Sequence, residues 1–153
     1  MRGVVSLTEH QRMAAELLND AFFEISPEAK FLLRVSAVEA LCPQANQPKA
    51  FKANVYAVIA AIPAEVPHSD RNTIKQHLKS LAARQSARSA YMPKIRRLIG
   101  QDKATEFEIL YDKRSKFVHE GQGRASLGTA PDDALEIGLE LLLADIAQAA
   151  SQK

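Results

Sequence analysis

The chain has 153 residues, of which 46% are apolar, and it carries a net charge of +2. This length suits a single domain over residues 1–153 with a core of its own. No apolar run reaches the roughly 18 residues of a membrane span, and the first residues lack the apolar stretch of a signal peptide. A cytoplasmic protein without membrane association is therefore expected. A single cysteine, Cys42, excludes an internal disulfide framework.

Residues that favour helices dominate the chain, and its apolar residues recur close to every 3.6 positions. This pattern predicts an all-α fold. The first helix is expected to begin at a capping box, Ser6-x-x-Glu9, and to direct Met13, Leu17 and Phe22 toward the core.

Caps and proline residues predict the later helices. Ser26 and Pro27 are typical of the N-cap and first position of a second helix, and Pro93 should kink or interrupt a long fourth helix. The expected ranges are 27–41 for the second helix, 48–61 for the third, 70–99 for the fourth, 103–120 for the fifth and 131 onward for the last. The simplest arrangement is a bundle of five to six helices.

Positive charge is concentrated in the middle of the sequence. Residues 71–124 carry a net charge of +8, which leaves −6 for the rest of the chain. Such a segment is compatible with attraction of a polyanion such as RNA, although solvated helix faces also collect charge. Arg84, Arg88, Arg96 and Arg97 form a possible phosphate track, and solvated surface is the alternative interpretation.

The segment LYDKRSKFVHEG, residues 110–121, places an arginine inside an apolar stripe. A guanidinium is always charged, so Arg114 needs a partner or must line a cleft. One interpretation is a structural ion pair with Glu39 of the second helix. His119 also has a structural interpretation, because a histidine in the last turn favours the negative end of the helix macrodipole.

The two residues together permit another interpretation, cleavage of RNA without a metal. An arginine can grip a phosphate with two hydrogen bonds, and a histidine can exchange a proton near neutral pH. Residues five apart on a regular helix point about 140° away from each other. Either the helix breaks near residues 117–119, or a second subunit completes the site across a two-fold axis.

The Arg-x-x-x-x-His sequence at Arg114 and His119, followed by Glu-Gly, resembles the HEPN superfamily and most closely its Apea-like branch. The stretch FLLRVSAVEALC, residues 31–42, resembles the second-helix signature of that branch, with Glu39 at the acidic position. The resemblance spans the chain and implies a HEPN-type helical bundle that dimerises so that both motifs face one cleft. It implies a metal-independent endoribonuclease without a cofactor, in which Arg114 binds the phosphate and His119 transfers protons while the 2′-hydroxyl attacks.

Neighbouring residues are candidates for supporting roles. Many active HEPN members place Asn, Asp or His directly after the arginine, where this chain has Ser115. Lys113 and Lys116 could guide a phosphate backbone or be ordinary solvated lysines, and Tyr111 could stack on a base or belong to the core. Glu39 could orient the arginine or face solvent. The supporting set is Glu39, Tyr111, Lys113, Ser115, Lys116 and Glu120.

The expected partners are RNA, a second copy of the chain, and an antitoxin or other regulatory protein. The expected role lies in defence, stress response or a toxin-like activity. A non-catalytic HEPN module that binds RNA or a protein is the alternative, and a structural dimer anchored by Arg114 is a third hypothesis. No metal site is expected, because His10, His68 and His77 lack the spacing of zinc ligands.

Overall fold

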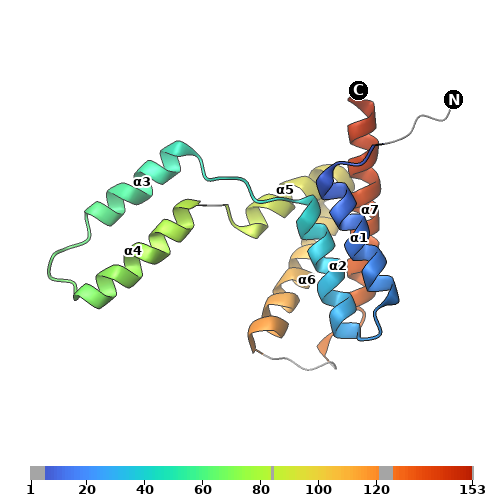
Figure 1. The fold of residues 1–153 in the computed structure, drawn as a ribbon, viewed down its shortest axis with the longest axis horizontal. Helices are drawn as coiled ribbons and strands as arrows, with labels where there is room; N and C mark the ends of the chain where they lie inside the picture. The colour runs from blue at the N-terminus through green and yellow to red at the C-terminus, as the bar shows by residue number, and fades with distance from the viewer. Residues whose placement is uncertain (1–5, 84, 121–125, 153) are drawn as a thin grey trace. The chain divides into compact units, whose positions relative to one another are not determined.

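The computed structural model describes residues 6–83, 85–120 and 126–152. Over these residues the fold is all-α, as predicted, with seven helices and no strand (Figure 1). The helices are α1 (Glu9–Phe23), α2 (Pro27–Leu41), α3 (Lys49–Ala60), α4 (His68–Ala83), α5 (Ala87–Ile99), α6 (Gln101–Glu120) and α7 (Ala130–Ser151). The chain forms two compact units, Met1–Pro43 with Tyr91–Lys153, and Gln44–Ala90. We call them the bundle and the hairpin.

The expected count of five to six helices is wrong, because the predicted fourth helix is two helices. α4 ends at Ala83, and α5 begins after Ser86, whose hydroxyl accepts a hydrogen bond from the backbone N–H of Ser89 at 3.2 Å. Pro93 lies inside α5 without ending it. A serine that caps a new helix therefore sets the boundary here, and the proline removes only a single backbone donor.

α1 begins later than predicted, and a different face of it is buried. Its capping box is formed by Thr8 and Gln11 rather than by Ser6. The exposed fraction is 46% for Met13 and 73% for Phe22, so neither belongs to the core. The buried residues are Gln11, Ala14, Leu18 and Ala21. The small alanines allow close approach of the neighbouring helices, which decides the buried face.

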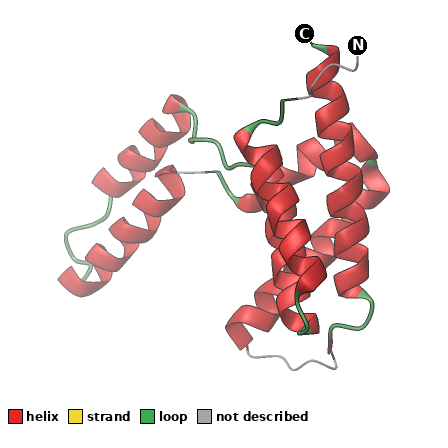
Figure 2. Cartoon of the chain, turned by 45° about the vertical axis from the view of Figure 1, so that its right-hand side comes forward, coloured by secondary structure: helices red, strands yellow, loops and turns green. Residues whose placement is uncertain are grey.

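The bundle consists of α1, α2, α6 and α7 packed side by side, together with most of α5 (Figures 1 and 2). α2 contacts α1, α6 and α7. Ser26 caps it by accepting a hydrogen bond from the N–H of Ala29 at 3.2 Å, and Pro27 occupies its first turn, as predicted. Its apolar stripe is fully buried as Phe31, Val35, Val38 and Leu41. α2 therefore forms the centre of the core.

Aromatic rings join α5 to α6 inside the bundle. The ring of Tyr91 meets that of Phe107 edge to face, with centroids 4.9 Å apart, and lies 5.2 Å from the ring of Tyr111. Phe107 is fully buried and Tyr91 is nearly so. This cluster fixes the inner face of α6, on which Arg114 also lies.

The hairpin consists of α3 and α4, which lie antiparallel and are joined by residues 61–67 (Figures 1 and 2). Arg71 holds this loop, because its Nη2 donates to the carbonyl oxygens of Pro63, Ala64 and Val66. At the other end, the N–H of Gln85 donates to the carbonyl of Ala45 at 2.9 Å. Val55 and Ala82 are the buried residues of the two helices.

None of the described helices is both long and apolar enough to cross a lipid bilayer.

Candidate functional site

Arg114 lies on the inner face of α6, one turn beyond the buried Leu110. Its Nη2 is 3.7 Å from Oε2 of Glu39 on α2, the partner named in the ion-pair interpretation. Each of the two side chains is 29% exposed, so the pair lies at the edge of the core rather than within it. The pair is long and solvated, and we expect it to contribute little to stability.

Tyr111 completes a group of three with Arg114 and Glu39. The Cζ atom of Arg114 lies 5.7 Å from the centre of the tyrosine ring, within the range of a cation–π contact. Burial raises the pKa of the Tyr111 phenol, and the charge of Glu39 and a hydrogen bond to it raise that pKa further, while Arg114 opposes them. The phenol therefore stays protonated and acts as a donor. Its ring contacts Tyr91 and Arg114, which supports the core interpretation of this residue.

The guanidinium of Arg114 retains hydrogen-bonding capacity. Its Nε is buried and has no hydrogen-bond partner among the residues that the structure describes. Its contact with Glu39 is longer than a good hydrogen bond. A partly exposed arginine that is held this loosely can accept an anion without first breaking a strong interaction.

His119 lies in the last turn of α6 and is exposed. The helix is continuous through Glu120, so the break expected near residues 117–119 as one of two arrangements is absent. Side chains five positions apart on such a helix diverge by about 140°. Within one copy of the chain, Arg114 and His119 therefore face different directions. The other arrangement, with a second subunit, stays a prediction.

The remaining supporting residues of α6 differ in exposure and in contacts. Lys113 donates from Nζ to the carbonyl of Leu127 at 3.3 Å, so it ties α6 to the segment before α7. Lys116 is exposed and forms no ion pair with a described residue, Ser115 is partly buried, and Glu120 is exposed. Among the lysines beside the motif, Lys116 alone is available to a ligand.

Among the described residues of the bundle, the buried arginine is Arg34, which is not one of the site residues predicted from the sequence. It is 6% exposed, and its Nη1 donates to the carbonyl of Pro131 at 2.8 Å and to Oδ1 of Asp132 at 3.1 Å. These contacts join the middle of α2 to the first turn of α7. The signal was present in FLLRVSAVEALC, where Arg34 interrupts an apolar stripe as Arg114 does.

A second polar cluster inside the bundle was also missed. Nζ of Lys94 lies 2.6 Å from Oδ1 of Asp145 and donates to the carbonyl of Leu41 at 2.7 Å. Gln11 donates to the other oxygen of Asp145 at 2.9 Å. Burial raises the pKa of the neighbouring Cys42 to about 12. The charged groups are satisfied and the thiol stays protonated, so this cluster offers no nucleophile.

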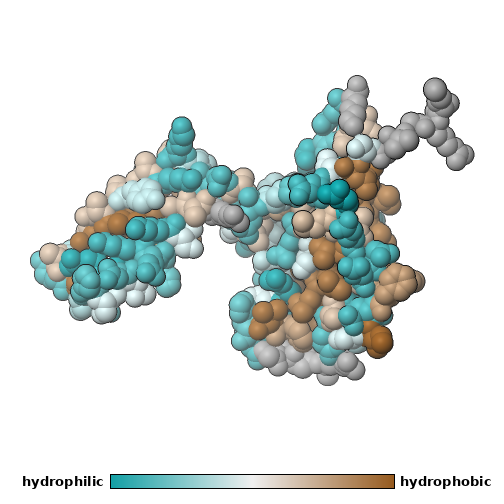
Figure 3. All heavy atoms as spheres, in the orientation of Figure 1, coloured by the Kyte–Doolittle hydropathy of each residue, from teal (hydrophilic) through white to brown (hydrophobic). Residues whose placement is uncertain are grey.

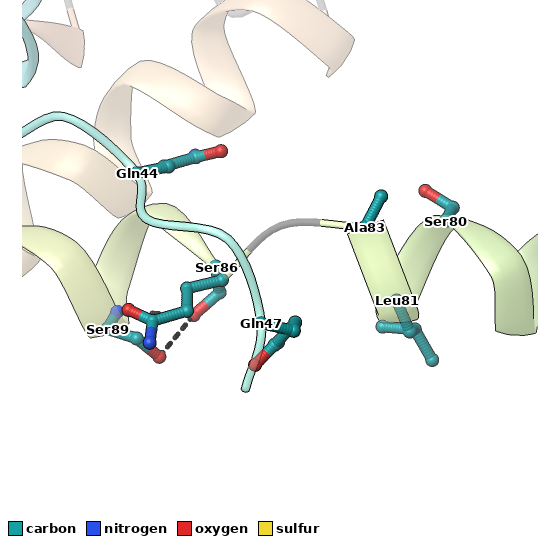
Figure 4. Close-up of a pocket in the computed structure, with 8 residues that line it drawn as sticks. Gln44, Gln47, Ser80, Leu81, Ala83, Ser86 and Ser89 are labelled. Atoms are coloured by element: carbon teal, nitrogen blue, oxygen red, sulfur yellow. Dashed lines mark hydrogen bonds between the residues drawn. The ribbon is translucent and has the colours of Figure 1, made fainter. Parts of the chain in front are cut away.

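The hairpin contains a cavity of about 480 Å³, which Figure 4 shows in close-up. Its lining residues are neutral: Gln44, Gln47, Ser80, Leu81, Ala83, Gln85, Ser86 and Ser89. The hydroxyls of two of these serines, Ser86 and Ser89, bond to each other at 2.8 Å. No titratable side chain lines the cavity, so its described walls supply no acid or base.

Metal ligands are not gathered anywhere in the described ranges, where no three His, Cys, Asp or Glu side chains are placed to hold an ion.

The chain matches no protein-family model, no curated protein and no solved structure. The HEPN resemblance, the single domain and the roles of Arg114 and His119 therefore stay predictions from the sequence.

Proposed function

We propose that the protein is a metal-independent endoribonuclease of HEPN type that acts as a dimer. The observation that carries this proposal is the state of Arg114, a partly exposed and weakly held guanidinium on the same helix as the exposed His119. In the reaction, the 2′-hydroxyl loses its proton and attacks the adjacent phosphorus. The bond to the 5′-oxygen breaks, this oxygen gains a proton, and a 2′,3′-cyclic phosphate remains.

The roles follow from the chemistry of the two side chains. Arg114 binds the oxygens of the scissile phosphate, whose negative charge grows in the transition state. His119 moves the proton, because imidazole can accept or donate one near neutral pH. Glu39 and Tyr111 position Arg114 and would release it toward the phosphate. The stress, defence or toxin-like role belongs to the same proposal.

The divergence of the two side chains on α6 means that the site requires two copies. A two-fold axis near the end of α6 would bring His119 of the partner subunit toward Arg114. Val118 supports an interface here, since it lies one turn beyond Arg114 on the same stripe and is 50% exposed. Covering this side chain would bury apolar surface and exclude water from the site.

Cleavage of labelled single-stranded RNA in EDTA tests the proposal. We expect cyclic-phosphate products from the unaltered protein and from His10→Ala, a control at an exposed histidine of α1. His119→Ala should lose activity by about 10²-fold or more, the contribution of a general acid or base. Cleavage that is equal in His119→Ala and in the unaltered protein would reject the proposal.

Mixing two inactive variants tests whether the site is shared between subunits. In a dimer of Arg114→Ala with His119→Ala, one of the two shared sites keeps both an arginine and a histidine. Partial recovery of cleavage after the variants exchange subunits is therefore expected. No recovery, with exchange verified by mass spectrometry, would place both residues of a site in one chain.

A non-catalytic module is the second candidate, and the continuity of α6 favours it. If Arg114 and His119 never share a pocket, the chain could retain RNA or a partner protein without cutting RNA. In that case RNA is bound but recovered intact, and charge reversal at Lys116 weakens binding more than His119→Ala does.

A further inference from the structure

The hairpin has two faces of opposite character, which follow from where its helices touch. The buried Val55 of α3 and Ala82 of α4 mark the seam between the helices. Successive residues of an α-helix are about 100° apart, so the position of every other side chain relative to this seam is fixed. For each helix, the rotation of a side chain away from the seam can be measured along the direction of its own chain. When two helices are antiparallel, side chains rotated in the same direction by this measure lie on the same face of the pair.

One face carries lysines from both helices. On α3, Lys49, Lys52 and Tyr56 fall within about 60° of one another, on one side of the seam. On α4, Lys75 and Lys79 are one turn apart and are rotated from the seam in the same sense. Tyr56 is 53% exposed, so an aromatic ring lies among the lysines. We call these five residues the basic face.

The opposite face is apolar. Phe51 and Val58 share a stripe of α3, and Ile74 and Leu81 share a stripe of α4, each pair being seven residues apart. Their exposed fractions range from 41% to 58%. Figure 3 shows an apolar strip beside the hydrophilic residues of the hairpin. Lysines are thus segregated to one side rather than scattered around both helices.

The lysines of the basic face are not neutralised. None of the four forms an ion pair with a described residue. Residues 44–90 contain seven Lys or Arg and two Asp or Glu, a net charge of +5, which leaves −3 for the rest of the chain. The hairpin therefore carries all of the excess positive charge of the protein and attracts polyanions.

We propose that the basic face binds single-stranded RNA, with lysines on the phosphates and Tyr56 stacked on a base. Lysines interleaved with an exposed aromatic ring are the arrangement that grips a single strand without reading its sequence. A duplex hides its bases from Tyr56, so it would use the lysines alone. That this RNA is the substrate rests on the proposed nuclease activity, and the binding itself does not.

The test uses the full chain with His119→Ala, so that RNA stays intact, and a fluorescent oligouridylate followed by anisotropy. Lys52→Glu with Lys79→Glu should raise the Kd at least about tenfold and flatten the salt dependence by about 0.7 per lost phosphate contact. Tyr56→Ala should weaken binding by about fivefold or more, which corresponds to the loss of one stacked base. Both changes lie at surface positions, and circular dichroism verifies that the helices persist.

Arg12→Glu with Lys30→Glu is the matched control, since it makes the same change of charge at solvent-accessible positions of α1 and α2 in the bundle. The proposal expects this control to bind nearly as well as the parent. Equal binding by the Lys52/Lys79 variant and its parent, or a larger loss in the Arg12/Lys30 control, would overturn the proposal. Lys52→Gln with Lys79→Gln removes the charges without reversing them and should give a smaller loss of RNA affinity. If charge reversal unfolds the hairpin, this neutral variant tests the proposal in its place.

The result of this RNA-binding test can be distinguished from the result of the test for nuclease activity. Hairpin-dependent binding without cleavage by the native chain supports the basic face and rejects the nuclease. Cleavage that is unaffected by the lysine changes, together with unaltered RNA affinity, keeps the nuclease and rejects the basic face. If heparin displaces the RNA and Tyr56→Ala leaves the RNA affinity unchanged, the basic face binds polyanions in general. That result would contradict the proposed stacking of Tyr56 on a base.

Discussion

The bundle and the hairpin are both made of amphipathic helices, yet they use their apolar residues differently. In the bundle, large side chains such as Phe31, Phe107 and Ile137 are completely buried. In the hairpin, Val55 and Ala82 are the buried residues of α3 and α4, and Phe51 remains 42% exposed. Two short helices cannot cover each other on more than one side, so each keeps an open stripe. The bundle therefore supplies the stability, and the hairpin supplies surface.

A pair of phenylalanines gives the largest expected difference between the two units. Phe107→Ala removes a fully buried ring that packs against Tyr91, and should lower the free energy of unfolding by about 3–5 kcal/mol. Phe51→Ala shortens a side chain that is already 42% exposed, and should change the free energy of unfolding by less than about 1 kcal/mol. Urea unfolding followed by circular dichroism measures both. Comparable losses would mean that the apolar face of the hairpin is covered in solution.

A pair of arginines sharpens the comparison within the bundle. Arg34→Ala removes a buried cation together with its hydrogen bonds of 2.8 and 3.1 Å, and should cost about 2–3 kcal/mol of unfolding free energy. Arg114→Ala breaks a partly solvated pair at 3.7 Å, and should cost about 0–1 kcal/mol. Thermal and urea unfolding report both values. A larger loss for Arg114→Ala than for Arg34→Ala would support the hypothesis of a structural anchor.

The smallest expected effect concerns thiol reactivity. Cys42 is buried in the bundle and its pKa is raised to about 12, whereas a cysteine introduced by Ala53→Cys would lie at an exposed position of α3. At pH 8 a disulfide reagent should modify the introduced thiol readily and leave Cys42 intact in the folded protein. Absorbance of the released thiolate follows the reaction. Rapid modification of Cys42 would show that the bundle opens easily.

The raised pKa of Cys42 also predicts how the stability of the protein changes with pH. Below the ordinary thiol pKa of 9.0 both folded and unfolded states are protonated, so the contribution of Cys42 to stability is fully present. As the pH rises from about 9 toward 12, the unfolded thiol ionises first and this contribution is lost. The stability of the unaltered protein should therefore fall more steeply over this interval than that of Cys42→Ala.

Local signals predicted the parts of the fold that neighbouring residues control. Ser26 and Pro27 mark the start of α2, and its buried stripe follows from helical spacing alone. The contact of Arg114 with Glu39 was one of the interpretations left open, because a cation on an inner face needs a counter-charge or a cleft. The start of α1 and the boundary at Ser86 were not anticipated, since several residues nearby could have served as caps.

The sequence predicted which residues belong to the candidate site better than it predicted how they are arranged. The motif named Arg114 and His119, but only the continuous α6 shows that they diverge within one chain. Arg34 and Arg114 look alike in the sequence, each inside an apolar stripe. Their burial differs because Arg34 lies where α7 covers α2, while Arg114 lies toward the end of α6. Arg84, a member of the possible phosphate track, lies outside the described residues.

By itself the sequence determined the all-α class, the stripe of α2 and the inward position of Arg114, because helical periodicity depends only on the spacing of residues along one segment. The tertiary structure decided which arginine is buried, and it separated the basic face of the hairpin from its apolar face. Burial depends on which helix covers which stripe, and that choice is made between segments far apart in the chain.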